Sequence, residues 1–155
     1  AVVTSWHSAI YRDVAVAGAN GRVEDAPAPP TPPASLPREV ILHVPREAAH
    51  VYGECADIWN PIHSERRAAL SVGLPDIVLH GTATWAMAGR EIVKAYVGGD
   101  PTRLRRLRAR FQAPIVPGGD IGLAHGPGAS GQAHFRVGNA RAETALADGY
   151  AEWGS

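Results

Sequence analysis

The segment at residues 81–98, GTATWAMAGREIVKAYVG, is the longest stretch of the chain with a helical pattern. Apolar residues lie around most of the circumference of this helix, and such a distribution is typical of a helix inside a protein core. The sequence therefore predicts one long helix at the centre of the fold.

The residues after this helix change from a helical period to the alternation of a β-strand. In RLRRLRARFQAPIV, residues 103–116, apolar residues alternate with arginines, which indicates a half-exposed strand. Glycine-rich turns at residues 117–119 and 126–131 then separate it from further strand-like segments. Helices followed by hairpins predict an α+β domain, in which an antiparallel sheet wraps over one long helix.

Ahead of the central helix, the sequence predicts a short strand and two short helices. The strand is EVILHV at residues 39–44, and Pro45 then opens a helix that ends at residue 59 before an Asn-Pro pair. A second helix covers residues 64–72 and is closed by Gly73. One face of the first helix is predicted to be core, and it consists of Ala48, Val51, Tyr52, Cys55 and Trp59.

Composition divides the chain into three parts. Residues 1–25 are rich in β-branched and aromatic side chains, and we expect a strand over residues 2–18. Residues 26–38 form a linker, because the stretch at 26–37 holds six prolines, which favour extended polyproline geometry. The remaining residues, 39–155, are predicted to fold as the α+β domain.

Charge and cysteine content narrow the classes of function. Lys+Arg and Asp+Glu both total 15, which speaks against nucleic acid and an anionic membrane as partners. No apolar run approaches the ~18 residues of a membrane-spanning helix. The single cysteine, Cys55, fits a reducing compartment, and we expect a cytoplasmic protein. The histidines and the cysteine lack the spacing of a metal site.

Several short motifs occur in a fixed order between residues 52 and 120. Tyr52 is followed by NPIH at residues 60–63, by an Ala-x-x-x-Gly segment at residues 69–73, and by HG at residues 80–81. In this order and spacing the motifs resemble the MaoC-like dehydratase family, the R-specific enoyl-CoA hydratases with the hotdog fold. RFQAPIVPGGD at residues 110–120 also resembles a strand and turn of the family, with one extra glycine. The resemblance implies a hotdog fold for this chain.

The resemblance also implies a reaction, the syn addition of water to a trans-2-enoyl thioester or the reverse dehydration. It implies that His63 acts as acid and base and that the N–H of Gly81 steadies the thioester oxyanion. No separate cofactor is implied, because CoA or phosphopantetheine is part of the substrate. Candidate substrate-binding residues are Asn60, Trp59, His80, Trp85 and Arg108.

Each of these binding residues also has a structural interpretation. Asn60 can shape the loop around it, and His80, Trp59 and Trp85 can simply pack in the core. Arg108 belongs to a run of arginines that can bind the phosphates of CoA or of a carrier-protein arm, or form a solvated strand face. The sequence leaves these alternatives open.

One position departs from the family pattern. Counting back from His63 and forward from Tyr52 both place the family's catalytic aspartate at Ile58. Asp57, at the family's usual glycine position, and Glu54 are candidates for a second catalytic carboxylate, with plain solvent exposure as the alternative for Asp57.

Three interpretations of Ile58 follow. The chain is a hydratase with a relocated carboxylate, or a non-catalytic subunit that needs a partner chain, or a hotdog pocket reused for another reaction. Isomerisation, cyclisation and thioester hydrolysis are the candidates for such a reaction. Motifs such as NPIH and HG favour a working pocket, whereas Ile58 favours altered chemistry or none.

The resemblance also implies a partner. Hotdog folds generally pair their sheets edge to edge and share the active site across the interface. We therefore expect a homodimer, or a heterodimer with another hotdog chain. The opening segment and the linker look like the end of a preceding hotdog repeat and its connector.

Overall fold

The computed structural model describes residues 3–9, 14–15, 17–18 and 26–154. The chain divides into two compact units, Ala1–Thr31 and Pro32–Ser155. The described residues of the first unit form no helix or strand, so the strand predicted at residues 2–18 is wrong for that part of its range, and its other residues lie outside the described ones. β propensity favours an extended backbone but does not supply the neighbouring strand whose hydrogen bonds make a sheet.

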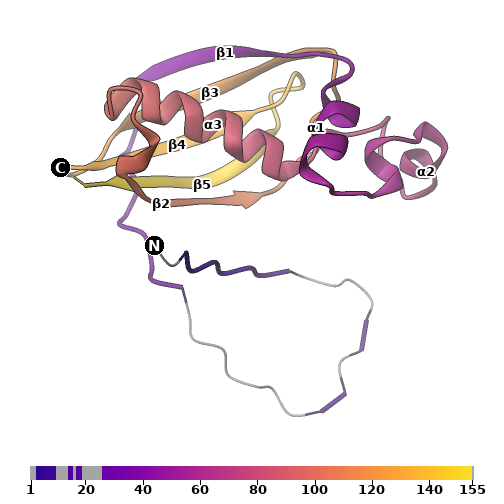
Figure 1. Ribbon diagram of the computed structural model, residues 1–155, viewed down its shortest axis with the longest axis horizontal. Coiled ribbons are helices and arrows are strands. Elements are labelled where there is room, and N and C mark those ends of the chain that lie inside the picture. Colours follow the sequence, from indigo (N-terminus) through magenta and orange to yellow (C-terminus); the bar gives the residue numbers. More distant parts are fainter. Residues whose placement is uncertain (1–2, 10–13, 16, 19–25, 155) are drawn as a thin grey trace. The chain divides into compact units, whose positions relative to one another are not determined.

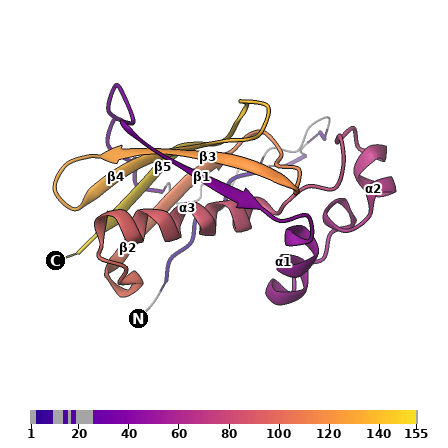
Figure 2. The ribbon, with the colours of Figure 1, turned by 90° about the horizontal axis from the view of Figure 1, so that it is seen from above.

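The second unit contains one antiparallel sheet with a long helix, α3, Gly81–Tyr96, across one face (Figure 1, Figure 2). The strand order is β1-β3-β4-β5-β2, and each neighbouring pair is antiparallel. This arrangement confirms the predicted α+β fold. The strands are β1 Arg38–Val44, β2 Leu104–Phe111, β3 Gly119–Pro127, β4 Gln132–Gly138 and β5 Thr144–Trp153.

The core lies between α3 and the sheet. Alternate residues of β4, namely Ala133, Phe135 and Val137, are buried there, as the twofold period of a strand requires. Only one side of α3 is buried, whereas Arg90 and Lys94 on the other side are exposed. The expectation of a helix buried on most sides is therefore wrong, because the sheet covers a single face and alanine is also tolerated at exposed helix positions.

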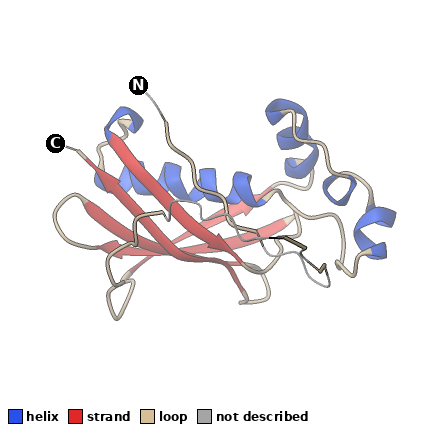
Figure 3. Ribbon diagram, turned by 90° about the horizontal axis from the view of Figure 1, so that it is seen from below, coloured by secondary structure: helices blue, strands red, loops and turns tan. Residues whose placement is uncertain are grey.

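Short helices lie beyond the end of the sheet, near the start of α3 (Figure 3). They are α1, Ala48–Ala56, the 3₁₀ turn η1, Pro61–His63, and α2, Arg66–Ser71. Gly73 closes α2 as predicted, since it has φ 81° and its N–H bonds to the carbonyl of Leu70. A second 3₁₀ turn, η2, Pro101–Arg103, precedes β2. Within the described residues, no helix has the length and apolar content that a bilayer crossing requires.

Helix α1 is shorter than the predicted range of residues 45–59 at both ends. Asp57 ends it by adopting the left-handed conformation, with φ 54° and ψ 40°. The N–H groups of Asp57 and Ile58 both bond to the carbonyl of Gly53, so the chain leaves the helix in a fixed direction. An aspartate is among the few non-glycine residues that tolerate this conformation, which sequence periodicity does not reveal.

The predicted core face of α1 is only partly correct. Ala48 and Tyr52 pack against the core, but Val51, Cys55 and Trp59 are exposed. Helix α1 sits beyond the end of the sheet and turns Ala49 and Gly53 inward. An apolar stripe on a helix therefore does not identify the core where only part of that stripe meets another element.

The left-handed residue at the end of α1 leads to a prediction about stability. Asp57→Ala should lower the free energy of unfolding by roughly 1–2 kcal/mol, because alanine is strained in this conformation. Asp57→Gly and Asp57→Asn should keep the wild-type value within about 0.5 kcal/mol, since both residues accept it. Urea unfolding of the three variants tests this, and an alanine variant as stable as the glycine variant would contradict it.

Two buried histidines on the sheet predict a loss of stability in mild acid. Burial lowers the pKa of His125 and of His134 from the ordinary value of 6.5, and the nearby Arg38 lowers the pKa of His125 further while Glu91 opposes this. The folded chain then binds fewer protons than the unfolded chain, so stability is full above 6.5 and falls as the pH drops below it. The slope should reach at most about 1.4 kcal/mol per pH unit for each histidine.

Urea unfolding at about pH 7.5 and about pH 5.5 measures this slope above the range where carboxylates titrate. In His134→Phe the dependence should be shallower than in the wild type, because one of the buried histidines with a lowered pKa no longer titrates, while His80 and His125 still do. Equal unfolding free energies of the wild type at both pH values would show that the buried histidines are not linked to folding.

Candidate active site

His63 is held at the last position of the 3₁₀ turn η1. Asn60 caps this turn, because its side-chain oxygen accepts a hydrogen bond from the N–H of Ile62 at 3.3 Å, and Pro61 opens it. The Nδ1 atom of His63 lies 2.7 Å from the carbonyl oxygen of Val78. A carbonyl can only accept, so Nδ1 donates and the neutral ring keeps a free lone pair on Nε2. The fold therefore presents Nε2 as a proton acceptor.

His80 lies directly against His63. It precedes α3 and is only 3% exposed, and its ring is stacked on that of His63 with centroids 3.7 Å apart. Its Nε2 donates to the carbonyl oxygen of Ile58 at 3.2 Å, and the ring of Tyr52 lies 5.0 Å away. Desolvation by burial lowers the pKa of His80, the bond to Ile58 opposes this, and His63 lowers it further. Burial thus favours the neutral form of His80.

Gly81 opens helix α3 next to an apolar cavity of about 250 Å³. The first N–H groups of a helix have no partner within the helix, and they can face a developing negative charge. A side chain at Gly81 would meet the ring of Phe111, since a Cβ atom there would lie 2.8 Å from Cδ1. The other residues around the cavity include Leu74, Leu79, Thr84, Ile115 and Leu146.

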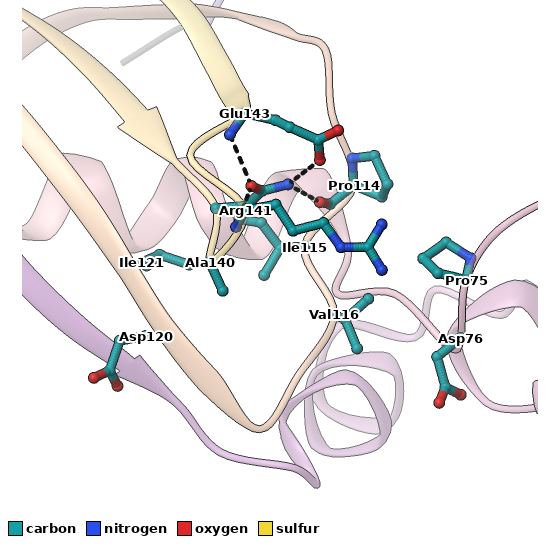
Figure 4. A pocket seen from close by; sticks show the side chains of 11 residues that line it. Pro75, Asp76, Pro114, Ile115, Val116, Asp120, Ile121, Ala140, Arg141 and Glu143 are labelled. Atoms are coloured by element: carbon teal, nitrogen blue, oxygen red, sulfur yellow. Dashed lines mark hydrogen bonds between the residues drawn. The ribbon is translucent and has the colours of Figure 1, made fainter.

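A second cavity, of about 230 Å³, lies behind the segment that contains Pro114 and Ile115, which line both cavities. Asn139 shapes its rim, because its amide group donates to the carbonyl of Pro114 and to the carboxylate of Glu143, two residues that Figure 4 labels. Its lining carries charged side chains, Asp76, Asp120, Arg141 and Glu143. The predicted site residues do not line this cavity, and it is distinct from the one beside Gly81.

The carboxylates proposed to replace the family's aspartate lie on the surface. Asp57 is exposed, and it accepts a hydrogen bond from the indole N–H of Trp59 at 2.9 Å. Glu54 is exposed on α1. Among the described residues, neither carboxylate makes a hydrogen bond with His63. Ile58 itself is fixed through its backbone, and its side chain is 42% exposed.

The remaining candidates are not all near the two histidines. Trp85 is half-buried on α3, and its indole N–H is buried without a hydrogen-bond partner in the described part of the chain. Arg108 is opposite Tyr150 on β5, one residue from Leu107, whose side chain faces α3 at Gly89. Because successive strand residues alternate, Arg108 points to the face away from α3. The binding roles of both residues stay predictions.

Three arginines of the run at residues 103–110 contact other residues of the fold. Arg110 pairs with Asp148 at 2.7 Å, Arg103 donates to the carbonyl of Gly154, and Arg106 lies over the ring of Tyr150. These contacts support the interpretation of the run as a strand face over the interpretation as a row of free cations.

Sequence reasoning missed the stacked arrangement of His63 and His80 and the part that the Val78 carbonyl plays. The two histidines are separated by 17 positions in the sequence, and backbone carbonyls carry no signal in a residue pattern. The HG pair at residues 80–81 was the available signal, because it placed a polar residue at the entry of an apolar helix.

Comparisons with known proteins identify the family of the chain. The family model described as MaoC like domain matches residues 30–136. The 3-hydroxyacyl-thioester dehydratase Y of Mycobacterium tuberculosis is 30% identical over 142 residues, which is 88% of this chain and 49% of that protein. The chain spans about half the length, or less, of the first curated relatives it matches.

Solved structures give the same result. A MaoC-like dehydratase from Phytophthora capsici superposes with a TM-score of 0.81 at 26% identity, covering 89% of this chain and 47% of that one. The ChsH1-ChsH2 complex from Mycobacterium tuberculosis reaches a TM-score of 0.63 at 14% identity, covers 81% of this chain and 99% of that one, and supports the fold alone. Since the family match covers more than half of the residues, the chain belongs to the MaoC-like dehydratase family.

Proposed function

We propose that the chain contributes a hydratase/dehydratase site that adds water to an enoyl thioester, or removes it from a 3-hydroxyacyl thioester. The thioester is that of CoA or of a carrier protein. The observation that carries this proposal is the fixed tautomer of His63, whose Nε2 is left as a free base by the bond from Nδ1 to Val78. Family membership and relatives named as dehydratases and enoyl-CoA hydratases support the same chemistry.

The residues account for the steps of water addition. Nε2 of His63 takes a proton from water as the oxygen attacks C3 of the enoyl group, and the negative charge moves to the thioester oxygen. The N–H groups at the start of α3, that of Gly81 first, stabilise this charge. The protonated His63 then delivers the proton to C2, which gives the 3-hydroxyacyl thioester and returns the neutral base. Asn60 holds the loop that carries His63.

Ile58 supports a second candidate function. A single acid/base group typically contributes ~10²–10⁴ to the rate, so a site that lacks the family's carboxylate is a slow hydratase unless another group replaces it. A non-catalytic or repurposed subunit that completes a partner's site is therefore the alternative. We keep Asp57 and Glu54 as proposed replacements, because both are exposed and a partner chain or a bound substrate can reach them.

An edge strand and a group of exposed apolar side chains favour a partner hotdog chain. Among the described strands, β2 is an edge strand that pairs with β5, so within this part of the chain its other edge can take up a further strand. Exposed apolar side chains gather around α1 and its end, namely Val51, Ile58 and Trp59. One structural neighbour is itself a complex, that of ChsH1 with ChsH2. We propose a homodimer or a heterodimer, and we place it in the cytoplasm because a single cysteine fits a reducing compartment.

The first prediction on function concerns His63. The full chain should hydrate crotonyl-CoA, measured as loss of the enoyl absorbance, and His63→Ala should lower kcat/KM by roughly 10²–10⁴ because the base is removed. His43→Ala is the matched control, since it removes an exposed imidazole on β1 and should leave the rate unchanged. A folded wild-type chain that shows no turnover, alone and with its partner chain, would exclude the hydratase and favour the non-catalytic subunit.

The second prediction tests the missing carboxylate directly. Ile58→Asp restores the family residue and should raise kcat at least about tenfold, whereas the neutral Ile58→Asn should not, because only the carboxylate can accept a proton from water. Asp57→Asn and Glu54→Gln complete the set. A large loss of kcat in one of these variants, together with no gain in Ile58→Asp, would show that the carboxylate removed there already acts as the second catalytic group.

A further inference from the structure

The stacked histidine pair suggests a role for His80 that family membership does not assign. His80 is buried, and only one of its two ring nitrogens has a hydrogen-bond partner among the described residues. One nitrogen, Nε2, donates to the carbonyl of Ile58, and the other, Nδ1, is buried with no hydrogen-bond partner among the described residues. A buried acceptor without a partner costs stability, so such an arrangement calls for a functional explanation.

His80 contacts both the proposed base, His63, and the backbone of Ile58. Its ring face lies on His63, with an angle of 23° between the planes. Its N–H fixes the carbonyl of Ile58, whose own N–H is bonded to Gly53 at 3.1 Å. Ile58 is thus held on both sides, and the position where the family carries its carboxylate cannot shift without breaking one of these bonds.

Space for this arrangement is provided by Gly53. A Cβ atom at Gly53 would lie 3.5 Å from Cε1 of His80 and 3.5 Å from the carbonyl oxygen of Ile58. A larger side chain would extend into the gap between α1 and the His80 ring. Helix α1 therefore packs against the Cε1–Nε2 edge of the His80 ring.

We propose that His80 is a positioning residue, which sets the ring plane of His63 by stacking and anchors the backbone of Ile58. This inference rests on the proposed hydratase function of the site. When His63 takes a proton, its positive charge develops against the face of a neutral imidazole, which attracts a cation weakly. A protonated His80 would instead repel this charge at a centroid distance of 3.7 Å. The neutral state of His80 is therefore part of the role.

Two substitutions test the stacking on His63 and the hydrogen bond to Ile58 one at a time. His80→Gln keeps an N–H donor of similar reach for Ile58 but removes the ring, and His80→Phe keeps a ring but removes the donor. In His80→Gln we expect kcat to fall at least about tenfold with KM within about threefold, because binding is retained while the base loses its orientation. His80→Phe should keep a larger share of kcat and unfold at a lower urea concentration, since the Ile58 carbonyl loses its partner.

Nitrogen-15 NMR of the histidine side chains gives a readout that does not depend on turnover. In the wild type, His63 should carry its proton on Nδ1 and His80 on Nε2. In His80→Gln the His63 ring loses the stacking that holds it against the Val78 carbonyl, so its signals should move towards the average of two exchanging tautomers. His50→Gln is the matched control, because Nε2 of His50 also bonds a backbone carbonyl, that of Ser64 at 3.2 Å, without stacking on His63. This control should leave both the His63 signals and kcat unchanged.

The outcomes separate this inference from the proposed function. Unchanged His63 signals in a folded His80→Gln chain overturn the positioning role, whatever the activity. Shifted signals in a chain without hydratase activity support the positioning role and overturn the hydratase. A fall in unfolding stability with kcat unchanged would reduce His80 to a structural residue. The wild type provides one more test, because a proton on Nδ1 of His80 would contradict the bond to Ile58 and with it the proposal.

Discussion

The close approach of helix α3 to the sheet is the constraint on which the rest of this structure depends. Small residues on the inner side of the helix allow it, and at Gly89 a Cβ atom would lie only 2.9 Å from the Leu107 side chain of β2. Because α3 is held along its length, its first residue is also fixed, beside Phe111 and the apolar cavity. The helix N-terminus, the stacked histidines and the cavity therefore keep their relative positions through core packing.

The active-site loop depends on backbone groups as much as on side chains. The Val78 carbonyl selects the tautomer of His63, and the Ile58 carbonyl selects that of His80. Asp57 contributes through its left-handed backbone at the end of α1, and its carboxylate faces Trp59. In this division of roles, position 58 takes part in the hydrogen bonding of the segment through its backbone N–H and carbonyl groups.

Sequence periodicity predicted the elements that have strong patterns. It failed where burial or strand pairing depends on other elements of the fold. The helix at residues 81–98 and the alternating strand after it were found, because their periods reflect a core that covers them continuously. The core face of α1 was predicted correctly only in part, because Ala48 and Tyr52 pack against the core whereas Val51 and Cys55 are exposed. The strand expected at residues 2–18 failed in its described part, since pairing depends on a partner strand and not on propensity.

The sequence by itself determined the fold class and the order of the motifs, and it predicted His63 as the base, because helix period, strand alternation and the spacing of NPIH and HG are local properties. Only the tertiary structure decided which nitrogen of His63 is free, that His80 lies against it, and that Asp57 and Glu54 are on the surface. These features arise from contacts between residues far apart in the chain. A hydrogen bond across such a distance depends on how the elements pack, and no local pattern records it.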